Sequence, residues 1–272
     1  MSTTTDDTLT LKVNNTVMSG WNDIRVTRGV ERLPSDFELS LTDWYPQEGY
    51  QLAPPGSSCT ITIGDDRVMT GYVDQWVNTL TPQSHDIRVT GRGMCQDLVD
   101  CSAWWENNMI KGGDALAIIR KLASVSVNSI SELSPASGYD SVMLATARDP
   151  EAASMRTRRH VTIVESTLMT TGCAQQAVNW EMNRRYGRSM ALNVTVDSWR
   201  DSAGVLWQPN TFVPVSIPAL GADSLNWLVS EVTFSRDDET GTTASLVLMP
   251  PEAFAVQPYR FYSGVAGRDV SS

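Results

Sequence analysis

The first hundred residues consist of short runs in which apolar and polar residues alternate. A period of two places successive side chains on opposite faces of an extended chain, so each run predicts a strand with one buried face. Turn residues separate the runs, as at Asn14-Asn15 and Gly64-Asp65-Asp66, because Asn, Asp and Gly tolerate tight turns. Many short strands with frequent turns predict a β-barrel or sandwich over residues 1–100. The runs are Leu9–Val13, Ile24–Arg28, Phe37–Leu41, Cys59–Ile63, Arg67–Asn78 and Ile87–Thr90.

The alternation is lost after Leu98, and residues 101–145 are predicted to form a helical connector. Asp114 follows Gly112-Gly113 and is a suitable N-cap for a helix over residues 115–123. The apolar residues of that segment fall on one helical face, which indicates a helix packed on one side.

Strand patterns return over residues 146–256, which predict a second barrel. His160–Val164 reads as a strand, and a helix about residues 167–187 follows it. Two further strands are predicted over Met190–Val196 and Phe212–Ile217.

The last predicted elements form a hairpin of Leu225–Arg236 and Thr242–Met249, followed by a tail over residues 257–272. Pro214 indicates an edge strand, because proline cannot donate to a ladder of hydrogen bonds. The predicted fold class is therefore mainly β with α (α+β): two antiparallel β-barrels joined by helical connectors.

The net charge and the cysteines limit the kinds of protein that this sequence can encode. The 272 residues carry a formal net charge of −10, which argues against a surface that grips nucleic acid, since phosphate binding needs Lys and Arg. Four cysteines without CxxC spacing predict buried thiols in a reducing compartment, with a Cys95–Cys101 disulfide as the alternative. The polar start predicts no signal peptide, and no segment is long and apolar enough to predict a membrane span.

No motif in the sequence indicates catalysis. Only His85 and His160 are available as imidazoles, and no zinc-ligand spacing or nucleophile elbow occurs. The carboxylate clusters Asp65-Asp66 and Asp237–Glu239 fall in predicted turns, where calcium binding is the minor alternative. We therefore predict a protein that is not an enzyme, with no catalytic residues, no metal ligands and no cofactors. A cell-wall hydrolase is the enzymatic alternative.

Nine tryptophans leave room for carbohydrate binding by a monomeric β protein as another alternative. Most of them lie in or beside periodic elements, where packing is the expected role. Trp104 and Trp105 differ, because two adjacent indoles after a barrel are difficult to bury together. They are the candidate subunit or partner interface, since aromatic residues are enriched at interfaces.

Short segments along both halves of the chain together resemble one family, the baseplate hub proteins of Mu-like contractile phage tails. In the first half they are Gly20-Trp21, Val26–Arg28, Glu31, Phe37–Leu39, Gly71–Asp74, Val89–Arg92 and Asp97–Cys101. In the second half they are Asp197–Trp199, Gly204–Asn210 and Leu228–Val232. No single segment is diagnostic, and their ordered combination carries the resemblance.

The resemblance implies a structural protein of the virion tail baseplate, made in the host bacterial cytoplasm. The resemblance further implies a trimer in which each subunit contributes two tail-tube-like β-barrels. Such a ring adapts the sixfold tail tube to the threefold central spike, and DNA passes through its lumen on ejection. Implied partners are further copies of the chain, the tail tube protein, the spike protein, the tape-measure protein and the baseplate wedge proteins. The hub of a tailocin or of a secretion spike is an alternative of the same kind.

Two further expectations follow. The lumen wall is predicted to be acidic or neutral and to bind no DNA sequence specifically, because attraction would stall the phosphate backbone. The chain departs from the family in length, since similar hubs carry an extra α/β domain between the halves. Either this chain naturally lacks that domain, or a stretch is absent from the sequence, and in both cases the join is predicted near residues 137–141.

Overall fold

The computed structural model describes residues 7–42, 52–100, 147, 171–217 and 222–256. Most of these residues lie in β-strands. The strands expected in the first hundred residues are confirmed, and one short strand, β2, was not predicted. The elements are β1 (Leu9–Val13), β2 (Thr16–Met18), β3 (Asp23–Gly29), β4 (Asp36–Thr42), β5 (Ser58–Ile63), β6 (Asp66–Leu80), β7 (His85–Gly93) and the short helix α1 (Gln96–Asp100).

The second described stretch begins with a long helix, which confirms the helix predicted about residues 167–187. The hairpin prediction is also confirmed, and Pro214 lies in β9, which among the described residues pairs only with β10. The elements are α4 (Thr171–Ser189), β8 (Leu192–Val196), β9 (Phe212–Ile217), β10 (Ala222–Asp237), β11 (Gly241–Met249) and η2 (Pro251–Phe254). The helix predicted at 115–123 and the strand at 160–164 lie outside the described residues.

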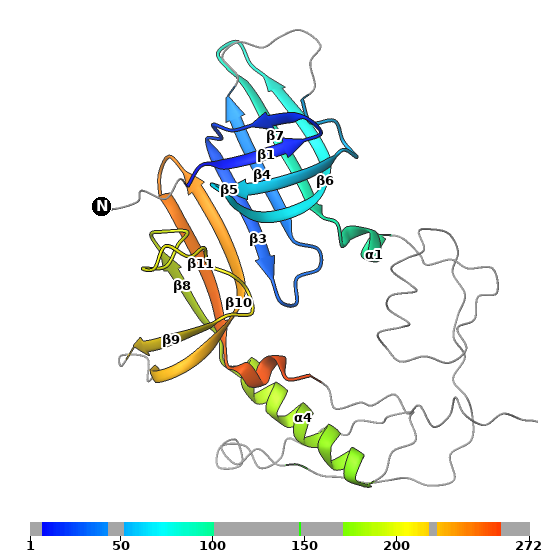
Figure 1. The fold of residues 1–272 in the computed structure, drawn as a ribbon, viewed down its shortest axis with the longest axis vertical. Coiled ribbons are helices and arrows are strands. Elements are labelled where there is room, and N and C mark those ends of the chain that lie inside the picture. Colours follow the sequence, from blue (N-terminus) through cyan, green and yellow to red (C-terminus); the bar gives the residue numbers. More distant parts are fainter. Residues whose placement is uncertain (1–6, 43–51, 101–146, 148–170, 218–221, 257–272) are drawn as a thin grey trace, which may run out of the picture. The chain divides into compact units, whose positions relative to one another are not determined.

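The strands form one antiparallel sheet in the order β2-β1-β5-β6-β7-β4-β3-β10-β11-β8, with β9 paired to β10. Residues 1–100 and 191–249 make up the compact unit that contains this sheet. β3 and β10 lie side by side in Figure 1 and pair antiparallel over Glu231–Arg236. The two halves of the chain therefore share a single sheet.

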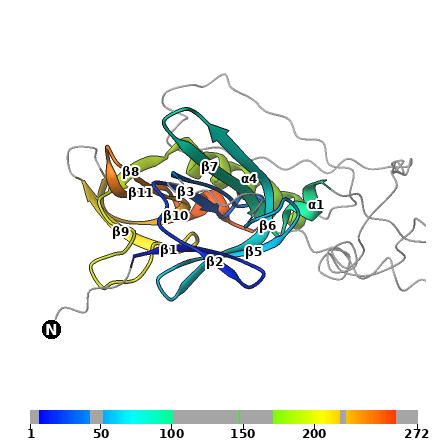
Figure 2. The same ribbon diagram turned by 90° about the horizontal axis from the view of Figure 1, so that it is seen from above.

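The expectation of two closed barrels is not met in the described residues. The strands of the first half curl so that β1 and β5 lie across from β7 in Figure 2. The second edge of β3 is occupied by β10, and β1 pairs with β2 and β5. Because β10 takes the second edge of β3, the strands of the first half do not close on β3, and the sheet stays open.

One face of this sheet is apolar across both halves of the chain. Directly opposed residues on seven neighbouring strands form a row that is apolar throughout, and most of its side chains are fully buried. Burial of such a row is the main favourable term in folding. The row runs Val196, Ala244, Phe234, Val26, Phe37, Gly91 and Val73.

A glycine, Gly91, lies in this row where backbone and side chains approach most closely. A Cβ added to Gly91 would lie 2.3 Å from the carbonyl oxygen of Tyr72 and 2.5 Å from the ring of Phe37. Gly71 of β6, which opposes Gly93, is equally constrained, because an added Cβ would lie 1.9 Å from the carbonyl oxygen of Arg92. Glycine is required here by the close approach of backbone and ring, a recognised reason for glycine inside a strand.

A second compact unit comprises residues 101–190 and 250–272, of which α4 and η2 are described. Trp180 of α4 donates from Nε1 to the carbonyl oxygen of Ala255 at 2.6 Å. A Cβ on Gly187 would lie 2.4 Å from the backbone nitrogen of Ala253, so the missing side chain permits this packing. The domain bounds 1–100, 101–145, 146–256 and 257–272 remain a prediction.

Substituting Gly91→Ala is expected to lower the free energy of unfolding by roughly 3 kcal/mol, the upper end of what overpacking costs. The matched control is Gly93→Ala on the same strand, where an added Cβ meets no atom nearer than 3.6 Å. Urea denaturation of both variants would measure the difference. Equal stability of the two would contradict the close packing described for Gly91.

Candidate functional site

An arginine joins the two halves of the sheet away from the strand ladder. Arg200 lies in the loop between β8 and β9, and its side chain is only 7% exposed. It donates to Asp7 at 2.8 Å, to Asp66 at 2.6 Å and to the carbonyl oxygens of Gly204 and Ile63. Burial alone would lower the pKa of Arg200, but the hydrogen bonds to the two carboxylates outweigh it and the pKa is raised. The loop is thereby fixed to the β5–β6 turn.

The residue before it, Trp199, fills the core of the C-terminal strands. Its ring is fully buried, packs edge-on against Phe234 and lies beneath the guanidinium of Arg236 at 4.5 Å. Its Nε1 donates to the carbonyl oxygens of Ser235 and Thr243. In the sequence, only the family resemblance drew attention to Asp197–Trp199 and Gly204–Asn210. In the structure, these segments help to hold the loop between β8 and β9 in place.

A second arginine cluster lies where the strands of the first half lead into α1. Asp74 is the extra residue of a bulge in β6, because Val73 opposes Gly91 and Gln75 opposes Thr90. Arg92 donates from Nε to Asp74 at 2.7 Å and from a terminal nitrogen to Asp100 at 2.7 Å. The bulge thus directs a carboxylate at the arginine, a common use of such irregularities.

These contacts shift the pKa values in a consistent direction. Hydrogen bonds to Asp100 and then Asp74 raise the pKa of Arg92, and the hydrogen bond from Arg92 lowers that of Asp100. A carboxyl with a lowered pKa in the folded state stabilises the fold above its ordinary range and loses that effect only as the pH falls through the lowered value. The Arg92 cluster is therefore intact at neutral pH.

The side of the sheet opposite the apolar row is polar, and we call it the polar face. Two rows of directly opposed residues define it, and Arg88 and Ser40 follow in the next row. The first row is Thr195, Ser245, Thr233, Thr27, Asp36 and Arg92. The second row is Thr243, Ser235, Arg25, Glu38, Thr90 and Gln75.

Ion pairs cross the strands of the polar face. Arg25 bonds to Asp36 at 2.6 Å and to Glu38 at 3.3 Å, and Arg88 pairs with Glu38. Arg32, from the loop after β3, reaches Asp36 of β4 and Glu231 of β10. The charges form a chain that runs across β10, β3, β4 and β7 rather than along any one strand.

Two strands of the sheet, β8 and the end of β6, have an edge without a partner strand among the described residues. Within the described residues, β8 pairs only with β11, and β6 beyond Tyr72 pairs only with β7. The exposed part of β6 carries Val77 and Leu80, whose surfaces are 42% and 78% exposed. Unpaired edges are surfaces on which another strand adds readily.

The predicted interface residues Trp104 and Trp105 lie outside the described residues, so their role remains a prediction. Among the other tryptophans, Trp21, Trp199 and Trp227 are buried as expected. Trp76, Trp180 and Trp207 are half-buried. The expectation of four buried thiols is wrong for Cys95, which is exposed and free, whereas Cys59 is buried and free.

The carboxylate clusters serve as turn and ion-pair residues. Asp237 accepts from the backbone nitrogens of Glu239 and Thr240, and Asp66 binds Arg200. The described residues include no group of three or more His, Cys, Asp or Glu that could hold a metal ion. No helix among them is long and apolar enough to cross a membrane.

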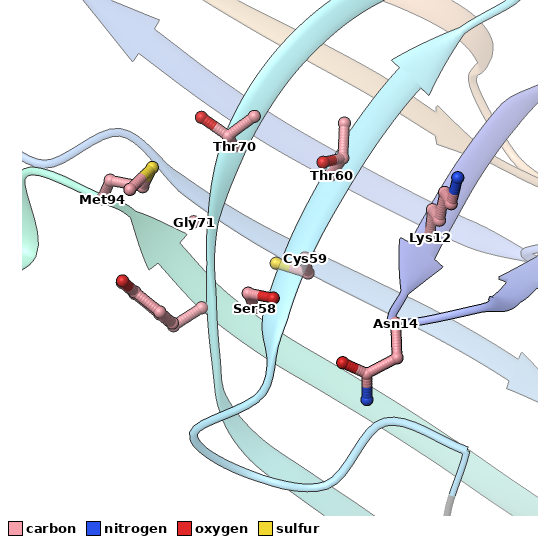
Figure 3. A pocket seen from close by; sticks show the side chains of 9 residues that line it. Lys12, Asn14, Ser58, Cys59, Thr60, Thr70, Gly71 and Met94 are labelled. Atoms are coloured by element: carbon pink, nitrogen blue, oxygen red, sulfur yellow. The ribbon is translucent and has the colours of Figure 1, made fainter.

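An open depression of about 330 Å³ lies over β1, β5 and β6 (Figure 3). Hydroxyls of Ser58, Thr60 and Thr70 and the amine of Lys12 line it, and no carboxylate or imidazole does. Cys59 at its floor is an inert thiol, because burial raises its pKa to about 11. The depression offers no acid–base pair for catalysis.

Replacing Arg200 with Ala should lower the free energy of unfolding by about 2 kcal/mol, the loss expected for hydrogen bonds of a charged group. The cost stays below that of a fully buried ion pair because Asp66 is 53% exposed and remains hydrated. Arg67→Ala removes the same charge from the exposed surface of β6 and should change stability by less than about 0.5 kcal/mol. Equal losses in thermal or urea unfolding would refute the role of Arg200.

Iodoacetamide at pH 8 should label Cys95 and leave Cys59 unmodified in the folded protein, because a thiol with a pKa near 11 is almost entirely protonated. Peptide mass spectrometry would score both sites, with a sample in urea as the control in which both react. Rapid labelling of Cys59 without denaturant would show that it is not buried.

Comparisons with known proteins identify a family to which this chain is similar. Residues 8–93 match the family model of the Mu phage baseplate assembly protein GpP-like N-terminal domain. Residues 170–257 match that of the fourth domain of the Mu phage baseplate assembly protein GpP. The curated baseplate hub protein gp44 of Escherichia phage Mu is 23% identical, with 92% of this chain and 89% of that protein covered. That alignment extends over 340 residues, so gp44 contains residues without a counterpart among the 272 here.

Solved structures share the fold. The 43 kDa tail protein of prophage MuSo2 from Shewanella oneidensis has a TM-score of 0.70 and 24% identity, covering 91% of this chain and 98% of its own. A tail protein from Neisseria meningitidis has a TM-score of 0.65 and 17% identity, covering 89% and 96%. An E. coli type VI secretion component has a TM-score of 0.55 and 10% identity, covering 92% and 79%. Because one family's first and fourth domain models match the two halves that share the sheet, the chain belongs to the Mu-like phage baseplate hub proteins.

Proposed function

We propose that this chain is the central hub of a contractile phage tail baseplate, in which three copies form a ring that adapts the sixfold tail tube to the threefold spike. DNA would pass through the lumen of that ring. The tail tube, spike, tape-measure and wedge proteins are its proposed neighbours. Trp104 and Trp105 are proposed to lie at one of these contacts.

The continuity of the sheet through β3 and β10 is the observation that carries this proposal. One chain supplies two sets of strands in one sheet, so three chains supply six sets around an axis. Such a ring fits a sixfold layer on one side and a threefold layer on the other. It also explains the free edges, because β8 of one copy can pair with the exposed part of β6 of the next, and a head-to-tail contact that closes makes a ring.

The alternative functions have less support than the hub. The named relatives are baseplate and tail proteins rather than hydrolases, which supports a structural role. The similarity to a type VI secretion component concerns the fold alone. A carbohydrate-binding monomer predicts exposed tryptophans, whereas those that the structure describes are buried or half-buried.

Light scattering of the purified chain should give a mass near three times 29.9 kDa. The double variant Val77→Lys, Leu80→Lys should shift the mass to that of a monomer, because lysines placed on an edge oppose strand addition. Val205→Lys is the matched control, since Val205 is 55% exposed and lies in the loop after β8 rather than on the exposed part of β6.

A monomeric mass of the unmodified chain that persists after addition of the spike protein would contradict the ring. A trimer that survives the double substitution would instead leave the ring standing and remove β6 from its interface.

A further inference from the structure

Four arginines on or beside the two rows of the polar face are already bound to carboxylates. Arg25 contacts Asp36 and Glu38, Arg88 contacts Glu38, and Arg92 contacts Asp74 and Asp100. Arg32, which reaches over from the loop after β3, contacts Asp36 and Glu231. This face therefore presents guanidinium groups whose donors are largely occupied.

The central part of this pattern is balanced in charge. Arg25, Arg32 and Arg88 match Asp36, Glu38 and Glu231 one for one, although the whole chain carries a net charge of −10. Asp23 and Asp86 lie on the same face and add negative charge, with Asp86 accepting hydrogen bonds from Thr42 and Ser84. The two rows that define this face contain no lysine, and Lys12 of β1 and Arg67 of β6 lie on the same side of the sheet outside these rows.

The direction of the ion pairs is also specific. The pairs of Arg25 and Arg88 connect the neighbouring strands β3, β4 and β7, so this part of the chain of charges follows the direction of the backbone hydrogen bonds between strands. In a ring made by continuing the sheet from copy to copy, that direction runs around the circumference. The apolar row lies on the opposite face and is buried, which leaves the polar face as the surface the sheet offers to an enclosed polymer.

We propose that Asp36 and Glu38 mask the arginines of the polar face, so that DNA moves past this face without being held by it. The inference rests on the proposed function only in that DNA must pass here. Guanidinium groups bind phosphate well because their planar donors match its oxygens. A carboxylate that already occupies those donors competes with phosphate, and the acids also repel the polymer.

Removal of the masking acids should therefore create a DNA-binding surface. The double variant Asp36→Asn, Glu38→Gln keeps similar side-chain shapes and frees Arg25, Arg32 and Arg88 from these two carboxylates. Fluorescence anisotropy with a random 30-base-pair duplex should show at least about a tenfold gain in affinity over the unmodified chain at low salt. The logarithm of the binding constant should fall with that of the salt concentration with a slope between about −2 and −3, as three phosphate contacts predict.

A charge-matched control separates masking from net charge. Asp65→Asn, Asp238→Asn removes two acids from hairpin turns and frees no arginine. Adding Arg25→Ala and Arg88→Ala to the Asp36→Asn, Glu38→Gln variant should abolish the gain. Equal gains in the turn variant, or no gain in the polar-face variant, would overturn the proposal.

Folding and assembly are followed in the same samples. Circular dichroism reports whether each variant keeps its sheet, and Glu38→Gln alone gives a milder change that still frees Arg88. Light scattering reports the mass independently of DNA binding. A monomeric unmodified chain whose polar-face variant still gains DNA affinity would refute the ring and support masking, whereas a trimer without that gain would do the reverse.

Discussion

The pairing of β3 with β10 is the constraint on which the described sheet depends. It joins Val26 to Phe234 and Thr27 to Thr233 across more than two hundred residues of chain. Without it, the second edge of β3 and one edge of β10 would be open, and the apolar row would be divided into two shorter rows. Pairing at such sequence separation carries a large entropic cost of closure and must be compensated by burial on both sides of the joint. The fully buried Val26, Phe37 and Phe234 provide that burial.

The side-chain contacts of two arginines also connect the two halves of the sheet. Arg200 fixes the loop between β8 and β9 to the β5–β6 turn, and Arg32 connects β4 to β10. Their environments differ: Arg200 is nearly enclosed, whereas Arg32 and its partners are partly exposed. Pairs in water contribute little to stability, so the enclosed arginine is the one expected to matter for the fold. The exposed ones determine what the surface presents.

Local pattern was sufficient to predict the strands, the hairpins and α4, because alternation and turn chemistry act over a few residues. Strand order was not predictable in this way. Nothing in Ile24–Arg28 or Leu225–Arg236 identifies the other as its neighbour, and two separate barrels were the natural expectation. The same limit applies to the functional surfaces. Asp66 was read as a turn residue and Arg200 was not singled out, since their ion pair exists only after distant segments have folded together. The sequence signal that did relate the two halves of the chain was the order of the short segments that resemble the hub family.

The compact unit that contains the sheet is interrupted after Asp100 and resumes at Ala191, so residues 101–190 are an insertion into one continuous unit. For such an insertion the entropic cost of closure grows only with the logarithm of its length, about 0.6 kcal/mol for each doubling. Lengthening or shortening it therefore leaves the strand joint almost unaffected in energy. Related chains can therefore gain or lose whole modules at this position while keeping the same sheet.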